Sequence, residues 1–88
     1  MEKHYVYIHV NENGIFYVGK GSGRRLTQTT YRNKHWQNTV AKYPHWGAIE
    51  LLQNLSEERA YEVEQALIDL IGLSNLTNIH PGGVMFSG

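Results

Sequence analysis

The alternation of apolar and polar side chains near the N-terminus predicts a β-hairpin. Residues 4–10 and 15–20 are rich in Val, Ile and Tyr and alternate as the strands of a half-buried sheet do. The residues between them, 11–14, read Asn-Glu-Asn-Gly, which is typical of a tight turn. We therefore expect two antiparallel strands joined by a short loop.

The length of that loop decides which side chains share a face, because neighbouring residues of a strand point to opposite faces. A two-residue loop would place Tyr7 and Tyr17 on opposite faces. A three-residue loop over 12–14, which pairs Asn11 with Ile15, separates the residue types better. One face then carries Tyr5, Tyr7, His9, Tyr17 and Gly19, and the other carries Val6, Ile8, Val10, Phe16 and Val18. The pattern favours the three-residue loop.

The middle of the chain predicts two helices and a third strand. Residues 20–23, Lys-Gly-Ser-Gly, are too rich in glycine for a regular element, and a short helix is expected over about 23–29. Asn33 can cap a second helix that ends near Tyr43. The run 48–55, Ala-Ile-Glu-Leu-Leu-Gln-Asn-Leu, predicts a strand with its first isoleucine and leucine on one side.

A long helix over residues 57–71, capped by Ser56 and ended by Gly72, carries a carboxylate among its apolar positions. The apolar stripe consists of Ala60, Val63, Leu67, Leu70 and Ile71. Glu64 falls inside this arc, where an unpaired carboxylate is costly, so it needs a partner. Either it forms a buried ion pair with an arginine or lies at the edge of the stripe, or it is a metal ligand or catalytic acid.

Composition excludes several classes of protein. The 88 residues, 41% hydrophobic and 18% charged, predict one globular domain spanning residues 1–88. There is no cysteine, hence no disulfide framework or thiolate metal site. No apolar run approaches the roughly 18 residues of a membrane span, and the start Met-Glu-Lys-His is no signal peptide. We therefore expect a cytosolic protein with no membrane partner.

The charges are distributed unevenly, although the net charge is zero. No acidic residue lies between Glu12 and Glu50, and this stretch holds six of the eight Lys and Arg residues. They are Lys20, Arg24, Arg25, Arg32, Lys34 and Lys42. Aromatic residues, including Trp36 and Trp46, are interleaved with them. A basic segment of this kind suits a nucleic acid, although a solvated basic face would have the same composition.

The hairpin and the segment after it resemble the opening signatures of the GIY-YIG nuclease family. Tyr5-Val6-Tyr7 stands where that family has its first signature, and Tyr17-Val18-Gly19 matches the second. Lys20 follows as it does in the DNA-repair members. Arg25-Leu26 resembles the arginine-hydrophobe pair that opens the family's first helix.

The second half of the chain continues this resemblance. Ala60, Glu64 and Ile68 match the alanine, metal-binding glutamate and isoleucine of the family's long helix. Leu76-Thr77-Asn78, followed by Gly82-Gly83, resembles the asparagine-glycine close of the domain. The resemblance spans about residues 5 to 83, and the order and spacing of its motifs are more specific than any one of them.

The resemblance implies both a fold and a reaction. The fold is a small α/β domain of the α+β type: a three-stranded antiparallel sheet flanked by helices, in the order β-β-α-α-β-α. The reaction is the hydrolysis of phosphodiester bonds by a metal-dependent endonuclease of bacterial or phage type, acting on nucleic acid, with double-stranded DNA expected. A second copy, or an additional DNA-binding domain or partner, would supply target preference.

The same resemblance assigns roles to individual residues. Glu64 would hold one Mg²⁺ or Mn²⁺ ion, and the hydroxyls of Tyr7 and Tyr17, converging near it, would help to deprotonate the attacking water. Arg25 and Lys20 would stabilise the phosphate in the transition state, and Asn78 would orient the end of the site. The residues expected to bind nucleic acid are Lys20, Arg24, Arg32, Lys34 and Lys42.

One departure from the family pattern leaves alternatives open. Many members have a histidine or tyrosine one helical turn after the arginine, where this chain has Thr29. Tyr31 or His35 could take its place as a general acid or base, and His9 is a third candidate. One alternative function is a catalytically inactive nucleic-acid-binding module. Another is a protein-interaction domain that uses its two tryptophans, with the long helix's buried glutamate in an ion pair.

Overall fold

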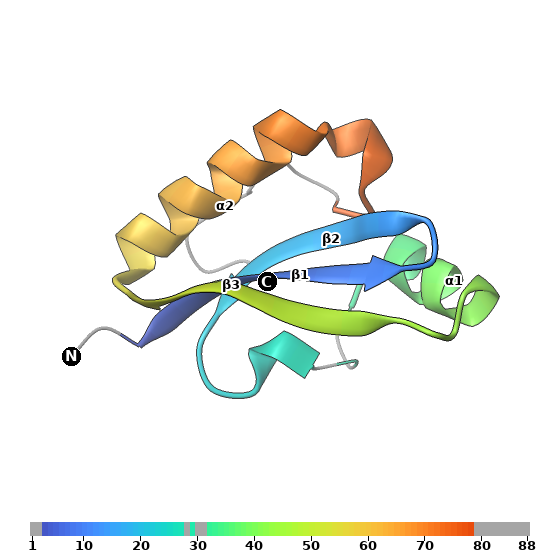
Figure 1. Cartoon of the computed structure of the whole chain (residues 1–88), viewed down its shortest axis with the longest axis horizontal. Helices are drawn as coiled ribbons and strands as arrows, with labels where there is room; N and C mark the ends of the chain where they lie inside the picture. Colours follow the sequence, from blue (N-terminus) through green and yellow to red (C-terminus); the bar gives the residue numbers. More distant parts are fainter. Residues whose placement is uncertain (1–2, 28, 30–31, 79–88) are drawn as a thin grey trace.

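A three-stranded antiparallel sheet organises the chain, as the fold class predicts (Figure 1). The computed structural model describes residues 3–27, 29 and 32–78. The elements in order are β1 (His4–Asn11), β2 (Gly14–Gly21), the 3₁₀ turn η1 (Arg25–Thr27), α1 (Lys34–Lys42), β3 (Gly47–Leu55), α2 (Glu57–Ile71) and the 3₁₀ turn η2 (Leu73–Asn75). The strand order is β2-β1-β3, so β1 is central and β2 and β3 are the two edges.

The two faces of the sheet are covered by different elements. Helix α2 lies across one face, and η1 lies on the other, with α1 near the hairpin turn (Figure 1). The core under α2 consists of Val6, Ile8, Val18, Ala60, Ile68 and Leu76. A second, aromatic cluster consists of Tyr5, Tyr7, Phe16, Tyr17 and Trp36. Because β1 and β2 alternate, each strand supplies both clusters.

The hairpin has the predicted pairing over most of its length but a different turn. His9 lies opposite Tyr17, and the face that carries the tyrosines is confirmed. The loop contains only two residues, because Asn11 pairs with Gly14, whose φ of +111° suits a glycine. The extra residue is Phe16, which forms a β-bulge and turns to the tyrosine face instead of the predicted apolar face. The bulge restores the alternation that a two-residue loop alone would invert.

Both predicted helix caps are present. The Asn33 side chain accepts a hydrogen bond from the backbone N–H of Trp36, 2.8 Å away, and begins α1. Ser56 accepts in the same way from the N–H of Arg59 and begins α2. Gly72, with a φ of +95°, ends α2. These local signals fix the start and end of the long helix and hence the position of Glu64 along it.

The helix predicted over 23–29 is wrong. Within the described part of this segment, the only helical element is the single turn η1, which begins at Arg25 and ends at Thr27. Gly23 has a φ of +63°, which no regular right-handed helix contains, so the helix cannot start there. The β-branched Thr27 and Thr29 have low helix propensity, which disfavours its extension.

Strand β3 contains a bulge that changes its predicted pattern. Ile49 pairs with Ile8, whereas Val6 pairs with Leu52, so Leu51 is the additional residue between them. Ile49 and Leu52 therefore share the α2 face, whereas the sequence pattern predicted that Ile49 would share a face with Leu51. The shift follows from the pairing with β1, which local sequence does not encode.

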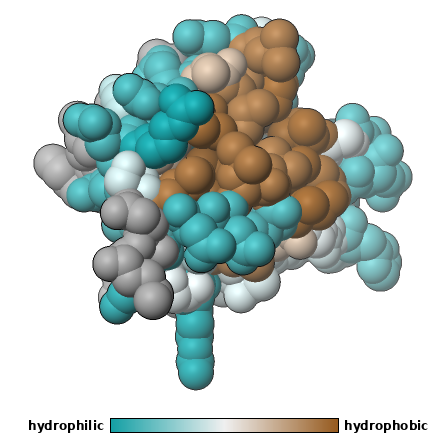
Figure 2. Space-filling model, turned by 60° about the vertical axis from the view of Figure 1, so that its left-hand side comes forward, coloured by the Kyte–Doolittle hydropathy of each residue, from teal (hydrophilic) through white to brown (hydrophobic). Residues whose placement is uncertain are grey.

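One side of the molecule is apolar and exposed. Figure 2 shows apolar side chains gathered in one continuous area. The large apolar residues that are more than a third exposed are Ile15, Ile49, Leu51, Leu52 and Leu70, three of them on β3. Within the described part of the chain, no helix has the length and apolar character needed to cross a bilayer.

Candidate active site

Glu64 is a buried carboxylate on the inner side of α2. It lies one turn from both Ala60 and Ile68 and is 4% exposed. Burial raises its pKa from the ordinary value of 4.5 to about 7, while the charge of Lys20 and a hydrogen bond from the Lys20 backbone amide act to lower it. Its Oε1 atom accepts no hydrogen bond from the described residues. The predicted burial of Glu64 is confirmed, and its buried Oε1 is left without a hydrogen-bond donor from the described residues.

Lys20 approaches this carboxylate from β2. Its side chain is 4% exposed, and its Nζ lies 3.8 Å from Oε2 of Glu57 in the first turn of α2. Among the described residues, no lysine or arginine forms a direct ion pair with Glu64. The alternative in which an arginine neutralises Glu64 is therefore not supported. Lys20 is a buried cation whose charge acts on two glutamates.

Asn78 lies on the outer edge of β2. Its side-chain Nδ2 donates to the Val18 carbonyl, 2.8 Å away, and its Oδ1 accepts from the Val18 N–H at 3.2 Å. Thr77 binds the same edge, since its N–H and hydroxyl both donate to the Phe16 carbonyl. Lys20 is the next residue on this edge, two residues or about 7 Å from Val18. The β2 edge thus brings together three predicted site residues: Lys20, Glu64 and Asn78.

Tyr7 and Tyr17 lie together on the other face of the sheet. Their ring centroids are 6.1 Å apart. The Tyr7 ring covers Gly19, where a Cβ atom would lie only 2.5 Å from Tyr7 Cζ, so the glycine makes room for the ring. The Tyr7 hydroxyl is fully buried without a hydrogen bond of good geometry. Burial and, less strongly, Tyr17 raise the pKa of Tyr7 to about 12, against the opposing charge of Arg32.

The tyrosines share one face, as predicted, but Glu64 approaches from the other, so the convergence of their hydroxyls near its carboxylate stays a prediction. The rings of Tyr7 and Tyr17 pack in the aromatic cluster, whereas Glu64 belongs to α2 on the opposite face. The physical reason is the alternation of β2, which directs Tyr17 to one face and Val18 and Lys20 to the other. Since β2 is an edge strand, groups from the two faces can meet only around its outer edge.

Arg25 and Arg32 both belong to the tyrosine face. Arg25 packs its aliphatic stem against Gly21, where a Cβ would lie 2.5 Å from the arginine Cβ, and its charge lowers the pKa of Tyr7. Arg32 is only 5% exposed. Its Nη2 donates to the Arg25 carbonyl, 2.8 Å away. The prediction that Arg32 is a surface contact for nucleic acid is therefore wrong, because the residue lies inside the aromatic cluster.

His9 is fully buried and uses both ring nitrogens. Its Nε2 lies 2.7 Å from the Leu26 carbonyl and donates to it, because the Trp36 indole N–H donates to Nδ1 at 3.0 Å. Burial lowers the pKa of His9 from 6.5 to about 4, although the hydrogen bond to Leu26 acts to raise it. A neutral imidazole with both nitrogens engaged cannot exchange protons with a substrate, so His9 is a structural residue.

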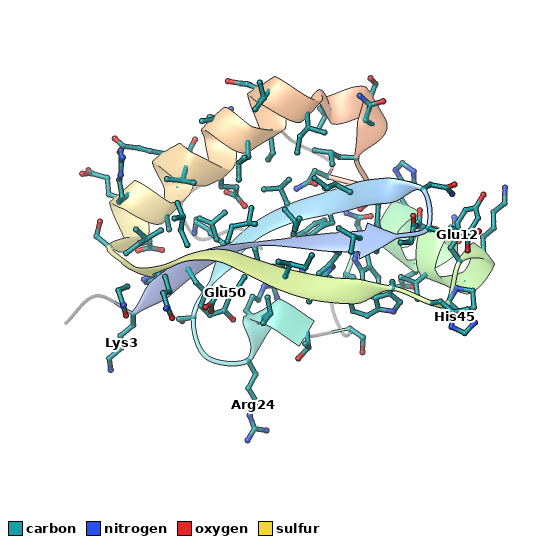
Figure 3. All side chains as sticks on the ribbon, in the orientation of Figure 1. Lys3, Glu12, Arg24, His45 and Glu50 are labelled. Atoms are coloured by element: carbon teal, nitrogen blue, oxygen red, sulfur yellow. The ribbon has the colours of Figure 1, made fainter. Side chains whose placement is uncertain are left out.

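The remaining predicted residues lie at the surface or outside the described range. Tyr31 is outside the described residues. His35 is exposed on α1 and lines a pocket of about 220 Å³ at the hairpin turn. Arg24 projects away from the sheet beside η1 (Figure 3), and Lys34 and Lys42 are exposed on α1. These three cations remain available for phosphates.

The sequence patterns missed the residues that enclose His9. The ring centroids of Phe16, Trp36 and Trp46 lie 5.9, 5.8 and 4.8 Å from that of His9. Trp36 is 2% exposed, which argues against the protein-interaction alternative based on the two tryptophans. The spacing of Asn33 and Trp36 around a helix start could have indicated that this side chain faces inward. No local signal indicated that it would contact a histidine.

A metal ion would have one protein carboxylate here. Among the described residues, no three His, Cys, Asp or Glu side chains lie close enough together to hold a metal ion. Mg²⁺ commonly takes one or two carboxylates and keeps several waters, and Glu64, whose Oε1 has no hydrogen bond, supplies a carboxylate of the kind that such an ion uses. A site for zinc, which prefers three or four protein ligands, does not fit these residues.

A comparison with protein-family models, curated proteins and solved structures gave no match.

Proposed function

We propose that the chain is a metal-dependent endonuclease that hydrolyses phosphodiester bonds in nucleic acid, with double-stranded DNA as its substrate. The observation that carries this proposal is Glu64, a buried carboxylate with an unbonded oxygen and a pKa raised to about 7. Such a group lowers stability unless a cation offsets its charge. The order of the tyrosine, arginine and glutamate motifs, which resembles the GIY-YIG family, supports the same reaction in a cytosolic protein.

The residues divide the chemistry between the two sides of β2. Glu64 would hold one Mg²⁺ or Mn²⁺ ion, and the ion would withdraw charge from the scissile phosphate. Tyr17, on the edge strand that also carries Lys20, is the residue we assign to accept the proton of the attacking water. Tyr7 is fully buried with a pKa of about 12, so we assign it to holding Tyr17 in place. Arg25 would bind the phosphate from the tyrosine face.

Incubation with supercoiled plasmid tests the reaction. The wild type should nick the plasmid with Mg²⁺ and not with a chelator, and Glu64→Gln should not nick it. Glu62→Gln is the matched control, because Glu62 lies on the same helix but its side chain is 56% exposed. Titration calorimetry of Mg²⁺ alone provides a second readout that does not depend on the choice of DNA. Nicking that persists in Glu64→Gln would refute the assignment.

A second experiment separates phosphate positioning from catalysis. Neutralising the exposed Lys34 and Lys42 should flatten the salt dependence of DNA binding by up to about two units of log–log slope, with little change in turnover. Arg25→Ala should lower turnover by roughly two to three orders of magnitude with a modest loss of binding. Equal effects on turnover would mean that Arg25 does not act on the reacting phosphate, with Arg24 the next candidate.

The inactive nucleic-acid-binding module is the second candidate function. The complete burial of Tyr7 favours it, because a buried phenol with a raised pKa is a poor base. This alternative predicts salt-dependent DNA binding without cleavage at any metal concentration. Either function would take its target preference from a second copy or from an additional DNA-binding domain or partner.

A further inference from the structure

Arg32 occupies a position that a surface phosphate contact would not have. Its guanidinium carbon lies 5.0 Å from the ring centroid of Tyr17, 5.8 Å from that of Tyr7 and 5.7 Å from that of Trp36. The residue is 5% exposed. A cation over several aromatic faces is attracted by their negative π surfaces, and the attraction is stronger where water is excluded. The guanidinium is therefore a fixed part of the aromatic cluster.

Arg32 and the residue that follows it connect several elements of the fold. The Arg32 Nη2 donates to the carbonyl of Arg25 in η1 at 2.8 Å, while the Arg32 carbonyl accepts from Gln37 Nε2 of α1 at 2.9 Å. The next residue, Asn33, caps α1 and donates to the Thr77 carbonyl at 3.0 Å. Arg32 thus sets where Arg25 lies relative to β2. A planar guanidinium can lie over the aromatic rings and donate to the Arg25 carbonyl at once, whereas a lysine ammonium cannot reproduce this geometry.

The charge of Arg32 acts directly on the tyrosine pair. Burial is the main cause that raises the pKa of Tyr7 to about 12, Tyr17 adds to it, and Arg32 and then Arg25 lower it. The titratable and charged groups that face or adjoin the Tyr7 ring are Tyr5, His9, Tyr17, Arg25, Arg32 and Glu50, its partner on β3. The guanidinium of Arg32 lies over both the Tyr7 and the Tyr17 ring. A cation within about 6 Å stabilises a phenolate by one or more pKa units.

We propose that Arg32 is a positioning residue of the proposed nuclease: it fixes Arg25 beside β2 and holds a positive charge against the phenols of Tyr7 and Tyr17. This inference rests on the proposed function for its effect on cleavage. Its effect on the tyrosines is a property of the protein alone and can be measured separately. The two parts predict different results for variants that keep or remove the charge.

The direct test is the ionisation of the tyrosines in Arg32→Gln, Arg32→Lys and wild type. Incorporation of 3-fluorotyrosine, which is more acidic than tyrosine, brings the titration into a milder pH range, and ¹⁹F NMR follows each residue after assignment by Tyr→Phe variants. In Arg32→Gln, the pKa of Tyr7 should rise by about one unit or more, because Arg32 acts to lower it. In Arg32→Lys it should stay closer to wild type. An unchanged pKa of Tyr7 in a folded Arg32→Gln would overturn the proposal.

Single-turnover cleavage provides the second test. Arg32→Gln should lower the rate by about tenfold or more and move the alkaline-rising part of the pH profile upward. Arg32→Lys should keep the position of the profile but lose rate, because Arg25 is no longer held. Arg59→Gln, which removes an exposed arginine of α2, is the control and should match wild type. Equal losses in both Arg32 variants, with an unshifted profile, would indicate a merely structural role.

Two further outcomes are also decisive. If Arg32→Gln does not fold by circular dichroism, Arg32→Met, which also removes the charge but keeps an apolar stem, replaces it in the ¹⁹F titration, and an unchanged pKa of Tyr7 in that variant overturns the proposal. If the wild type does not cleave DNA, the proposed function is wrong, while the ¹⁹F titrations still decide whether Arg32 controls the tyrosines.

Discussion

The Glu64→Gln substitution removes a buried charge and keeps the volume of the side chain. Because the folded pKa of Glu64 is raised from 4.5 to about 7, the folded protein binds this proton more tightly than the unfolded chain does. In the metal-free wild type, Glu64 therefore has no effect on stability below about pH 4.5, and its contribution becomes increasingly unfavourable as the pH rises to about 7. At about 1.4 kcal/mol per pKa unit, the loss at pH 8 is roughly 3 kcal/mol. Glutamine carries no such penalty and should be more stable there.

His9 contributes with the opposite sign in nearly the same pH range. Its pKa is lowered from 6.5 to about 4, so the unfolded chain binds the proton more tightly and stability rises with pH between about 4 and 6.5. The resulting change in the free energy of unfolding is again roughly 3 kcal/mol. In the wild type the two slopes should nearly cancel between pH 4.5 and 6.5. In Glu64→Gln only the His9 slope remains, so stability should rise through this range.

Urea unfolding followed by far-UV circular dichroism, in chelator at pH 4.5, 5.5, 6.5 and 7.5, measures both curves. The exposed Glu62→Gln variant should follow the nearly flat wild-type curve and controls for the general effect of losing a carboxylate. The difference between Glu64→Gln and wild type should grow with pH to about 1–2 kcal/mol, allowing about 1–2 kcal/mol for the buried amide. A difference that is independent of pH would refute the reasoning. Adding Mg²⁺ at pH 7.5 should stabilise only the wild type and Glu62→Gln.

Three further predictions concern stability and are checked by thermal or urea unfolding. Gly19→Ala should cost about 1–3 kcal/mol, because the new Cβ would lie 2.5 Å from Tyr7 Cζ in a packed ring, whereas Gly47→Ala, with nothing within 4 Å, should be close to neutral; equal losses would contradict this contact. Asn78→Asp replaces the donor to the Val18 carbonyl and should cost about 1–3 kcal/mol; a neutral result would mean that this contact does not hold the β2 edge. Leu70→Lys should change stability by no more than about 0.5 kcal/mol, because Leu70 is 83% exposed; a large loss would show that this surface is covered in solution.

Local sequence was sufficient wherever a structural feature depends on a few neighbouring residues. The hydrophobic alternation predicted β1 and β2, and the side chains of Asn33 and Ser56 predicted the starts of α1 and α2. The 3.6-residue period placed Glu64 on the apolar stripe of α2, and the structure confirms that it is buried, whereas Leu70, which the same period placed on the stripe, is 83% exposed. The confirmed predictions succeed because caps, strand alternation and helical periodicity act within about one or two turns of chain.

Only the tertiary structure decided which groups face one another. The Phe16 bulge is set by the pairing of β1 with β2, and it directs Phe16 to the aromatic cluster. The burial of His9 and Arg32 depends on α1, which packs its Trp36 against the hairpin. Trp36 and His9, which form a hydrogen bond, are 27 positions apart in the sequence. Tyr17 and Glu64 belong to opposite faces of the sheet because α2 covers the face opposite the tyrosines. A basic or imidazole side chain has the same local pattern at the surface as in the core, so its burial is determined by the elements that pack over it.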